Sequence, residues 1–386
     1  MTTLTPDIPA GPIFSTAIPP LHIATSGKYV DISITIDTDS ADGTRKEIYS
    51  SRLHTISGTI DLDIRSIITT WMDAHATPTA RYTITASGSG DTQAATLTLT
   101  VIYSRGTISG DAAQFTANRF LTLSLSKLLP LNRAFDSLSA WCEQAESGSI
   151  ILILRATYAP GDTQKINVEF PIQSTPGYNR FDLDFQAILD DLITTAEPTP
   201  LTLTPLRATV TLGDRVYTYR FIPSLPSAAI SFANNFLAPE HFWMFGSWSR
   251  SGKVTQKKTL VGSLYQSAGA EPDPEFTLIT HPLQFTQTYT IPDITMSRAV
   301  WVYLFAQGSP LTRQAFKATP VAPGSSALAA ATFKAIPTEG SLEASPHATD
   351  MQTHTIKVIA ASLPDALGYQ FEIPRIFTDQ FSHPFI

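Results

Sequence analysis

Cysteine is nearly absent from this sequence, with Cys142 the only one among 386 residues. A single thiol cannot form an intrachain disulfide, and it cannot provide the several thiolates of a cysteine-ligated metal site. Cys142 follows Ala140 and Trp141, and in this apolar context we expect it to be a small buried hydrophobic residue. The chain therefore has to fold without disulfide bonds of its own.

Charged residues are also scarce, at 15% of the sequence, whereas about 25% is usual for soluble domains. The formal net charge of −7 argues against a surface that follows a phosphate backbone, so we expect no nucleic-acid partner. Low surface charge suits a subunit that buries much of its surface against neighbours, although an ordinary Thr-rich β protein has the same composition. The densest basic stretch, Lys253 with Lys257 and Lys258, predicts the polar tip of a hairpin.

Long apolar runs are missing as well. No run approaches the ~18 apolar residues of a transmembrane helix, so we expect no membrane insertion. The segment from Met1 to Pro20 has neither a basic start nor an apolar stretch, and it does not resemble a secretory signal. We therefore expect a protein made in the cytoplasm, which would reach the outside of a cell by lysis or by assembly.

The motifs that usually carry catalysis are absent too. There is no Gly-x-Ser-x-Gly and no phosphate-binding Gly-rich loop. Ser124 and Lys127 match the Ser-x-x-Lys pattern of some serine nucleophiles, but in an alternating strand rather than at a helix start. A run from Asp37 superficially resembles a calcium loop, yet its twelfth residue is Ile48 rather than a bidentate glutamate. No two histidines have a metal-binding spacing. We expect no enzymatic activity, catalytic residue, cofactor or metal, and a hydrolase with a cryptic site is the remaining enzymatic hypothesis.

What the sequence does contain is a long internal repeat. Asp182-Leu183-Asp184-Phe185 repeats Asp61-Leu62-Asp63-Ile64 at a distance of 121 residues, and each copy is followed by apolar residues at helical spacing. A repeat of about a hundred residues is too long for a solenoid unit and fits a whole β-sandwich domain. Because i and i+2 share one face of a strand, the Asp-x-Asp pairs predict a role in the fold rather than a metal site.

A second echo, at a distance of 116 residues, relates Ala117–Leu121 to Ala233–Leu237 and predicts a strand that opens the second and third modules. The third module also has an aromatic strand from Phe242 to Trp248, with large apolar residues on both faces. Such a strand is usually buried on both faces. A protein interface or a sugar-stacking platform made by Phe242, Trp243 and Trp248 is the alternative.

These patterns predict an all-β fold with short helices, built from tandem immunoglobulin- or fibronectin-like sandwiches. Prolines dominate the start of the chain, and three phenylalanines spaced by four end it, so both ends are predicted to be arms. The predicted boundaries are an N-terminal arm at 1–25, modules at 26–112, 113–228 and 229–374, and an aromatic C-terminal arm at 375–386.

The third module also carries a family resemblance. The segments concerned are Asn234–Phe236, the aromatic strand with Gly246, the Lys257-Lys258 hairpin, Phe285–Thr290, Trp301 and Ile376–Phe381. Over roughly residues 115–386 the sequence resembles a family of structural proteins of tailed phages and prophages of gut anaerobic bacteria. It departs from that family where Leu237-Ala238-Pro239 follow the Asn-x-Phe opening in place of glycine, and in a long loop at 320–350.

The resemblance implies a virion protein of the tail tip or baseplate, whose partners are other tail proteins and copies of itself. We expect the arms to dock onto neighbouring chains, with Phe377, Phe381, Phe385 and Trp248 as the partner-binding residues. The alternative function is a carbohydrate- or receptor-binding adhesin on a tail or a cell surface, with a host glycan as the ligand.

Overall fold

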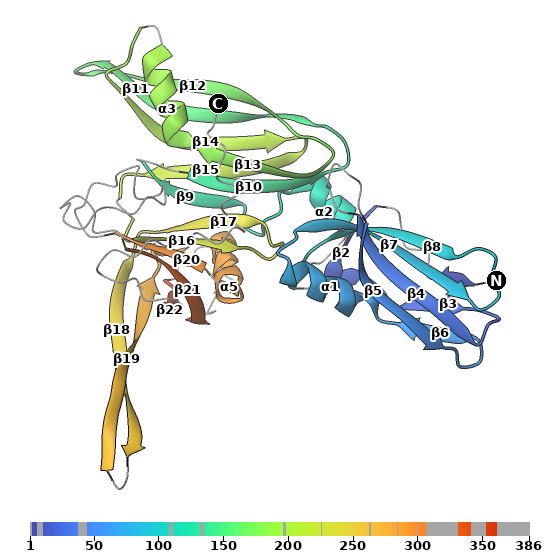
Figure 1. Ribbon diagram of the computed structural model, residues 1–386. Coiled ribbons are helices and arrows are strands. Elements are labelled where there is room, and N and C mark those ends of the chain that lie inside the picture. Colours follow the sequence, from blue (N-terminus) through green and yellow to red (C-terminus); the bar gives the residue numbers. More distant parts are fainter. Residues whose placement is uncertain are drawn as a thin grey trace.

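The computed structural model in Figure 1 consists mostly of β-strands with short helices, which confirms the predicted fold class. The structure describes residues 2–5, 11–37, 45–106, 108, 111–131, 135–195, 198–224, 226–261, 264–283, 285–298, 300–305, 331–340 and 353–360. We refer to residues 2–106 as the first unit, 111–224 as the second and 226–360 as the third.

The first unit is a sandwich whose core lies between a five-stranded sheet on one side and a three-stranded sheet with a helix on the other. The larger sheet has the order β2 (Pro12–Phe14), β8 (Ala95–Ile102), β7 (Thr79–Gly88), β4 (Tyr29–Asp37) and β5 (Arg45–His54). The smaller sheet has the order β1 (Thr3–Thr5), β3 (Leu21–Ala24) and β6 (Thr59–Leu62), and α1 (Ile64–Ala74) follows β6. The strand β4 has one face in this core, because every second residue from Val30 to Ile36 is buried.

The second unit repeats this topology, except that none of its described strands corresponds to β1. Its larger sheet has the order β12 (Asp162–Gln173), β11 (Ser147–Ala159), β14 (Thr202–Leu212), β15 (Arg215–Ile222) and β9 (Ser126–Pro130). Opposite it lie β10 (Phe135–Cys142), β13 (Gly177–Asp184) and α3 (Phe185–Thr195). In both units one edge strand of the large sheet is parallel to its neighbour: β2 pairs with β8, and β9 pairs with β15. All the other pairs of these two sheets are antiparallel. The repeated order supports duplication of one module.

The repeated Asp-Leu-Asp motif has the same two tasks in each copy. Its second aspartate begins the helix, since Asp63 accepts a hydrogen bond from the Arg65 backbone and Asp184 accepts one from the Ala187 backbone. Its first aspartate binds the neighbouring strand: Asp61 contacts His22 on β3 and Asp182 accepts from Ser137 on β10. The prediction that the motif serves the fold is therefore confirmed.

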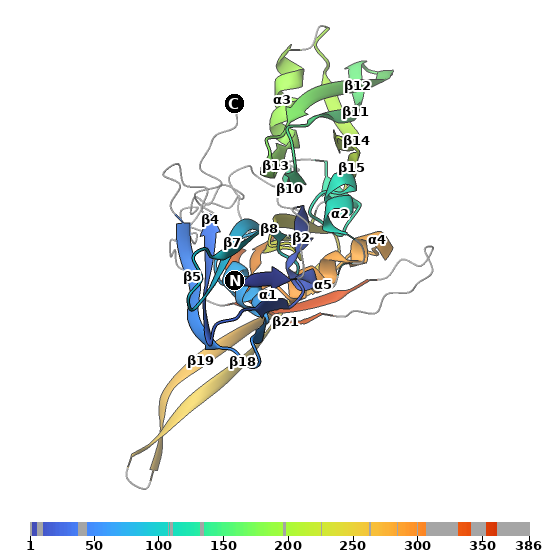
Figure 2. The same ribbon diagram turned by 90° about the vertical axis from the view of Figure 1, so that its right-hand side faces the viewer.

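The third unit is one antiparallel sheet of seven strands. Its order is β17 (Pro239–Met244), β16 (Ala228–Ala233), β20 (Val300–Leu304), β21 (Ala331–Gly340), β22 (Thr355–Ala360), β19 (Leu264–Ile279) and β18 (Ser247–Val261). The helices α4 (Phe285–Thr288) and α5 (Thr290–Thr295) follow β19 and precede β20 in the chain. Ile291 and Ile294 of α5 pack on one face of the sheet. The far ends of β18 and β19 project from the body as a two-stranded arm in both views (Figures 1 and 2).

The predicted N-terminal arm is wrong for residues 11–24. The side chains of Phe14, Ile18, Leu21 and Ile23 are at most 2% exposed. Apolar residues between the prolines fill the first unit's core, and the prolines do not prevent this because the short strands β1 and β2 lie at sheet edges, as predicted.

The strand predicted from the 116-residue echo is also wrong in both copies. Residues 117–121 end the helix α2 (Ala112–Asn118) and enter a loop. Residues 234–237 form the loop between β16 and β17. The long loop predicted at 320–350 is wrong for residues 331–340, which form β21. Its other residues, residues 38–44 of the run that resembles a calcium loop, and the C-terminal arm lie outside the described residues.

Candidate functional site at the junction of the three units

The three units meet at a loop between β16 and β17, which we call the hub loop (Asn234–Ala238). The Phe236 ring packs against Phe14 of the first unit and Phe115 of α2, with ring centroids 6.0 and 5.3 Å apart. Leu237 enters the core of the first unit. Its φ of 58° is a left-handed conformation, which costs a non-glycine residue about 1–2 kcal/mol. The buried side chain offsets this cost, so the loop shape is set by contacts with another unit.

Asn234 fixes the hub loop from inside. Its Oδ1 accepts hydrogen bonds from the backbone N–H groups of Phe236 and Ala238, at 2.9 and 3.2 Å. Its Nδ2 donates to the Leu121 carbonyl at 2.7 Å and to Glu240 at 2.9 Å. One buried side chain thus ties the third unit to the segment that joins α2 to β9, which explains why the 116-residue echo has different local structures in its two copies.

A buried charge cluster lies beside the hub loop, and we call it the junction cluster (Lys127, Asp136, Glu240). Lys127 on β9 and Asp136 on β10 come from the two sheets of the second unit, and Glu240 comes from β17. The Lys127 Nζ lies 3.0 and 2.8 Å from the two Asp136 oxygens and 3.0 Å from Glu240 Oε1. These residues are 5%, 1% and 3% exposed.

Neutral donors complete the junction cluster. The Tyr219 hydroxyl donates to Asp136 Oδ2 at 3.0 Å, and the His241 backbone N–H approaches Asp136 Oδ1 at 3.3 Å. Glu240 Oε2 accepts from the Thr122 hydroxyl at 3.2 Å as well as from Asn234. Among the described residues, Lys127 is the only partner of Glu240 Oε1. The contact between these two groups is an ion pair rather than a well-aligned hydrogen bond.

The electrostatics of the junction cluster follow from burial and from an excess of one negative charge. Burial acts to lower the pKa of Lys127, but the Asp136 and Glu240 carboxylates outweigh it and raise that pKa above its ordinary value. Burial raises the pKa of Asp136, against the effect of Lys127 and together with that of Glu240. Burial, aided by Lys127 and Arg180, holds the pKa of His241 well below its usual range. The resting state is therefore an ammonium between two carboxyl groups, beside a neutral imidazole.

Polar contacts also join the first and third units. Gly106 N–H donates to Asn235 Oδ1 at 3.1 Å, and the Arg105 guanidinium donates to the Ala233 carbonyl at 3.1 Å. An ion pair joins Arg298 to Asp73 of α1. Nearby, burial raises the pKa of Asp293 to about 7, the charge of Glu240 adds to the shift, and the Asn235 backbone and Arg105 oppose it.

The Ser-x-x-Lys match has no catalytic geometry. The Ser124 hydroxyl donates to the Ser126 carbonyl at 2.9 Å, while the Lys127 Nζ is directed at its two carboxylates. A small cavity of about 10 Å³, room for about one water molecule, is lined by both residues and by His281. Among the described residues no group of three His, Cys, Asp or Glu side chains could hold a metal ion.

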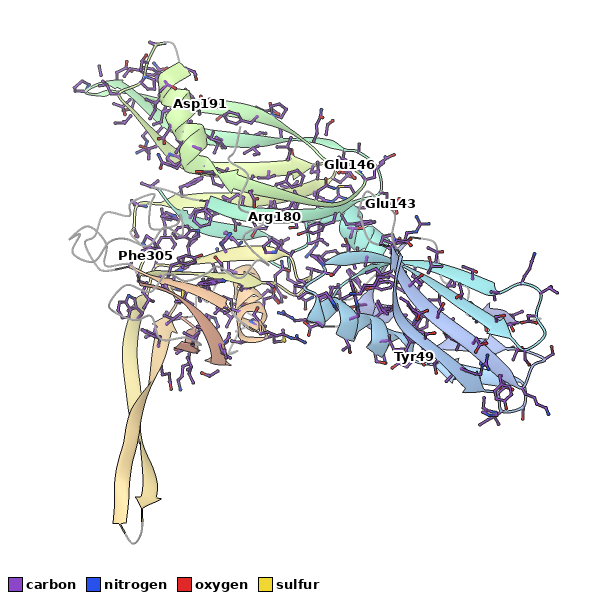
Figure 3. The ribbon with its side chains drawn as sticks, viewed as in Figure 1. Tyr49, Glu143, Glu146, Arg180, Asp191 and Phe305 are labelled. Atoms are coloured by element: carbon purple, nitrogen blue, oxygen red, sulfur yellow. The ribbon has the colours of Figure 1, made fainter. Side chains whose placement is uncertain are left out.

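The predicted partner-binding residues fall in different places. Trp248 lies at the base of the arm, 37% exposed, and its indole N–H donates to the Phe305 carbonyl at 3.2 Å. Phe242 and Trp243 are buried on opposite faces of β17, so the core interpretation is confirmed for both. Figure 3 shows Phe305 where the third unit meets the second, and its ring stacks on Trp243. Phe377, Phe381 and Phe385 lie outside the described residues.

Sequence reasoning missed the junction cluster, although one signal was present. Asp136 shares its face of β10 with Leu138, Ala140 and Cys142, which are all core residues. A charged residue in an inward-facing row predicts a buried partner of opposite charge. That partner is Lys127 on the neighbouring strand β9, but the second carboxylate of the cluster could not be predicted, because Glu240 comes from another unit.

Comparisons with known proteins do not identify the chain. No family model matches the sequence, and no curated protein matches it. Among solved structures, the calcium-binding domain CBD12 of CALX1.1 is 9% identical with a TM-score of 0.16, covering 57% of this chain and 100% of that one. Squid arrestin is 8% identical with a TM-score of 0.19, covering 57% and 93%. A DUF4785 family protein from Legionella pneumophila is 11% identical with a TM-score of 0.15, covering 52% of this chain and 49% of that one.

Scores this low say nothing about function. Within the part of the chain that the structure describes, no helix is long and apolar enough to cross a membrane.

Proposed function

We propose that the chain is a non-enzymatic structural subunit of an ordered assembly, namely a phage virion protein of the tail tip or baseplate. The observation that carries this proposal is the projecting arm. β18 and β19 have 15 and 16 residues, but β22 pairs only with Glu275–Ile279 of β19. The remainder of the hairpin extends beyond the sheet as a two-stranded ribbon (Figures 1 and 2). A ribbon that extends beyond its own sheet is a typical device for reaching a neighbouring chain.

The two edges of this arm differ. Pro272 and Pro274 lie opposite Val254 and Gly252, and since proline has no N–H, these positions cannot donate across the β18–β19 ladder or beyond it. Two prolines directly beyond the end of β22 remove backbone donors from β19, which disfavours strand addition to this strand. Among the described residues no strand pairs with the outer edge of β18. We place the docking edge there.

The composition of β18, the strand at this edge of the arm, favours an acidic partner strand. β18 contains Arg250, Lys253, Lys257 and Lys258 and no acidic residue, in a chain of net charge −7. Edge-strand addition supplies the backbone hydrogen bonds, and charge complementarity selects the partner. Partners of this kind include other tail proteins and further copies of the chain. Trp248 at the base of the arm and the C-terminal phenylalanines are proposed as additional contacts.

The rigid junction supports the same proposal. An arm can bridge subunits at a defined spacing only if the body that carries it does not flex. The hub loop and the junction cluster join all three units through buried contacts, so the direction of the arm is fixed relative to the first unit. The adhesin alternative lacks an equivalent observation, since Phe242 and Trp243 are buried.

Shortening the arm tests the proposal. Ser251 and Glu275 stand opposite each other, so residues 252–274 can be replaced by an Asn-Gly turn that closes the shortened hairpin. We expect the full chain to form ordered multimers, alone or with its genomic neighbours, in light scattering and electron microscopy. The shortened chain should melt at the same temperature but stay monomeric. Assembly that is unaffected by the shortening would refute the proposal, and glycan binding lost in Trp248→Ala would favour the adhesin.

A further inference from the structure

The junction cluster presents an energetic problem that packing alone does not explain. Three charged side chains are withdrawn from water, and their charges do not cancel, because one ammonium faces two carboxyl groups. A buried ion pair is often no more stable than apolar residues of the same volume, and an unbalanced third charge adds to the cost. Such a cluster is explained if Lys127 and Asp136 react with each other, because the reaction removes their two buried charges and leaves Glu240 as the single charged member.

The geometry meets the requirements of an amide-forming reaction. The Lys127 Nζ lies within 3.0 Å of both Asp136 oxygens, which places the nitrogen next to the carboxyl carbon. Tyr219 and the His241 backbone donate to those oxygens and polarise the carboxyl group. Glu240 Oε1 lies 3.0 Å from the same nitrogen, while Oε2 is held by Asn234 and Thr122. A nucleophile, an electrophile and a proton carrier are thus held together away from water.

We propose that Lys127 and Asp136 are joined by an amide bond that forms within the folded chain, with Glu240 as the proton-transfer group. One proton passes from the ammonium to Asp136, so that a neutral amine faces an uncharged carboxyl group. The nitrogen attacks Cγ of Asp136 and forms the N–C bond. Glu240 takes a second proton from the nitrogen and returns it to the departing hydroxyl. The C–O bond breaks and one water molecule leaves, with no oxidant, reductant or added cofactor.

Two features of the surroundings favour this outcome. Burial raises the pKa of Asp136, which favours the uncharged acid that the attack needs. The ammonium form of Lys127 is the resting one, so neutralising it is a cost, but fixed neighbours react with effective concentrations of roughly 10⁵–10⁸ M. The small cavity lined by Lys127, Ser124 and His281 has room for the water that is released. Both ring nitrogens of His281 lack a hydrogen-bond partner among the described residues and could hold that water.

The bond would tie the two sheets of the second unit together at the face that meets the third unit. Lys127 lies in the five-stranded sheet and Asp136 in the two-stranded sheet. Separation of the sheets under load would then require breaking a covalent bond. This property is independent of the proposed assembly role, because it is a reaction within one chain.

Intact-mass spectrometry of the purified full chain tests the proposal directly. We expect a mass that is lower than that of the sequence by one water molecule. Trypsin should then fail to cut after Lys127, and residues 120–133 should be recovered linked to residues 134–155. A folded chain with the full sequence mass and separate peptides would overturn the proposal.

Variants assign the roles. Lys127→Arg and Glu240→Gln should both have their full sequence masses, with folding checked by circular dichroism. Lys165→Arg on the exposed strand β12 is the matched control and should still lose one water molecule. Loss of water in folded Lys127→Arg would show that the missing water comes from another site and would also overturn the proposal. Loss of water in Glu240→Gln would exclude the proton-transfer role.

Discussion

Replacing Asp293 by asparagine should stabilise the protein, and increasingly so as the pH rises. Asp293 is 3% exposed on α5 and lies close to Glu240 and the hub loop. Burial raises its pKa from 3.8 to about 7. The folded chain therefore holds a proton on Asp293 between pH 4 and 7 that the unfolded chain has released, and in this range the free energy of unfolding falls as the pH rises.

The size of the effect follows from that pKa difference. A shift of about three units at about 1.4 kcal/mol per unit corresponds to roughly 4 kcal/mol, which is an upper limit because the structure can relax around the charge. Below pH 4 both states are protonated, and Asp293→Asn should have little effect. Above pH 7 the wild-type chain must keep a buried carboxylate, whereas the asparagine stays neutral. The gain should therefore appear through the window from pH 4 to 7 and level off above it.

Urea denaturation of both chains at pH 4.5, 6 and 8 measures this directly. The midpoint of Asp293→Asn minus that of the wild type should be near zero at pH 4.5 and clearly positive at pH 8. Asp162→Asn, at an exposed turn of β12, is the control and should give the same small difference at every pH. A difference between Asp293→Asn and wild type that does not change with pH would falsify the reasoning.

Three further predictions concern single features of the fold. Trp243→Ala removes a 1% exposed side chain from the contact between the second and third units, and it should lower the free energy of unfolding by about 3–5 kcal/mol in chemical denaturation. Trp248→Ala removes a 37% exposed side chain and should lower it far less. Equal losses would contradict the assigned burial. Asp63→Ala and Asp184→Ala should each cost about 1 kcal/mol through the loss of a helix cap, and a large difference between them would argue against equivalent roles in the two copies. Deleting residues 375–386 should abolish assembly seen by electron microscopy while leaving the melting temperature unchanged, and normal assembly would remove Phe377, Phe381 and Phe385 as docking residues.

Local patterns were sufficient to predict the internal repeat of the first two units. The apolar spacing in α1 and α3 and the repeated Asp-Leu-Asp motif depend on neighbours close in sequence, and each is found as predicted. The third unit was harder. The strand predicted at 233–237 is a loop from residue 234 on, because Phe236 and Leu237 pack against other parts of the chain.

The parts that could not be predicted depend on contacts between residues far apart in the sequence, most of them in different units. Nothing near Leu237 indicates that its side chain enters the core of the first unit, and nothing near Lys127 indicates Glu240 as a partner. The N-terminal segment has the same difficulty, because its prolines suggest an arm while Leu21 and Ile23 find their partners on β6 and across the sandwich. Such contacts require the tertiary structure.

These same contacts argue that the three units are not independent domains. Leu237 completes the core of the first unit, and Trp243, Ala229 and Phe305 complete that of the second. A first or second unit expressed alone would leave apolar gaps where these side chains belong, and the second would also leave Lys127 and Asp136 without Glu240. Duplication supplied two similar sandwiches, and the third unit fixes them by placing Leu237 in the core of the first and three side chains in the core of the second. The direction of the arm is therefore a property of the whole chain, which is what a subunit needs if it must place its neighbour at a fixed distance.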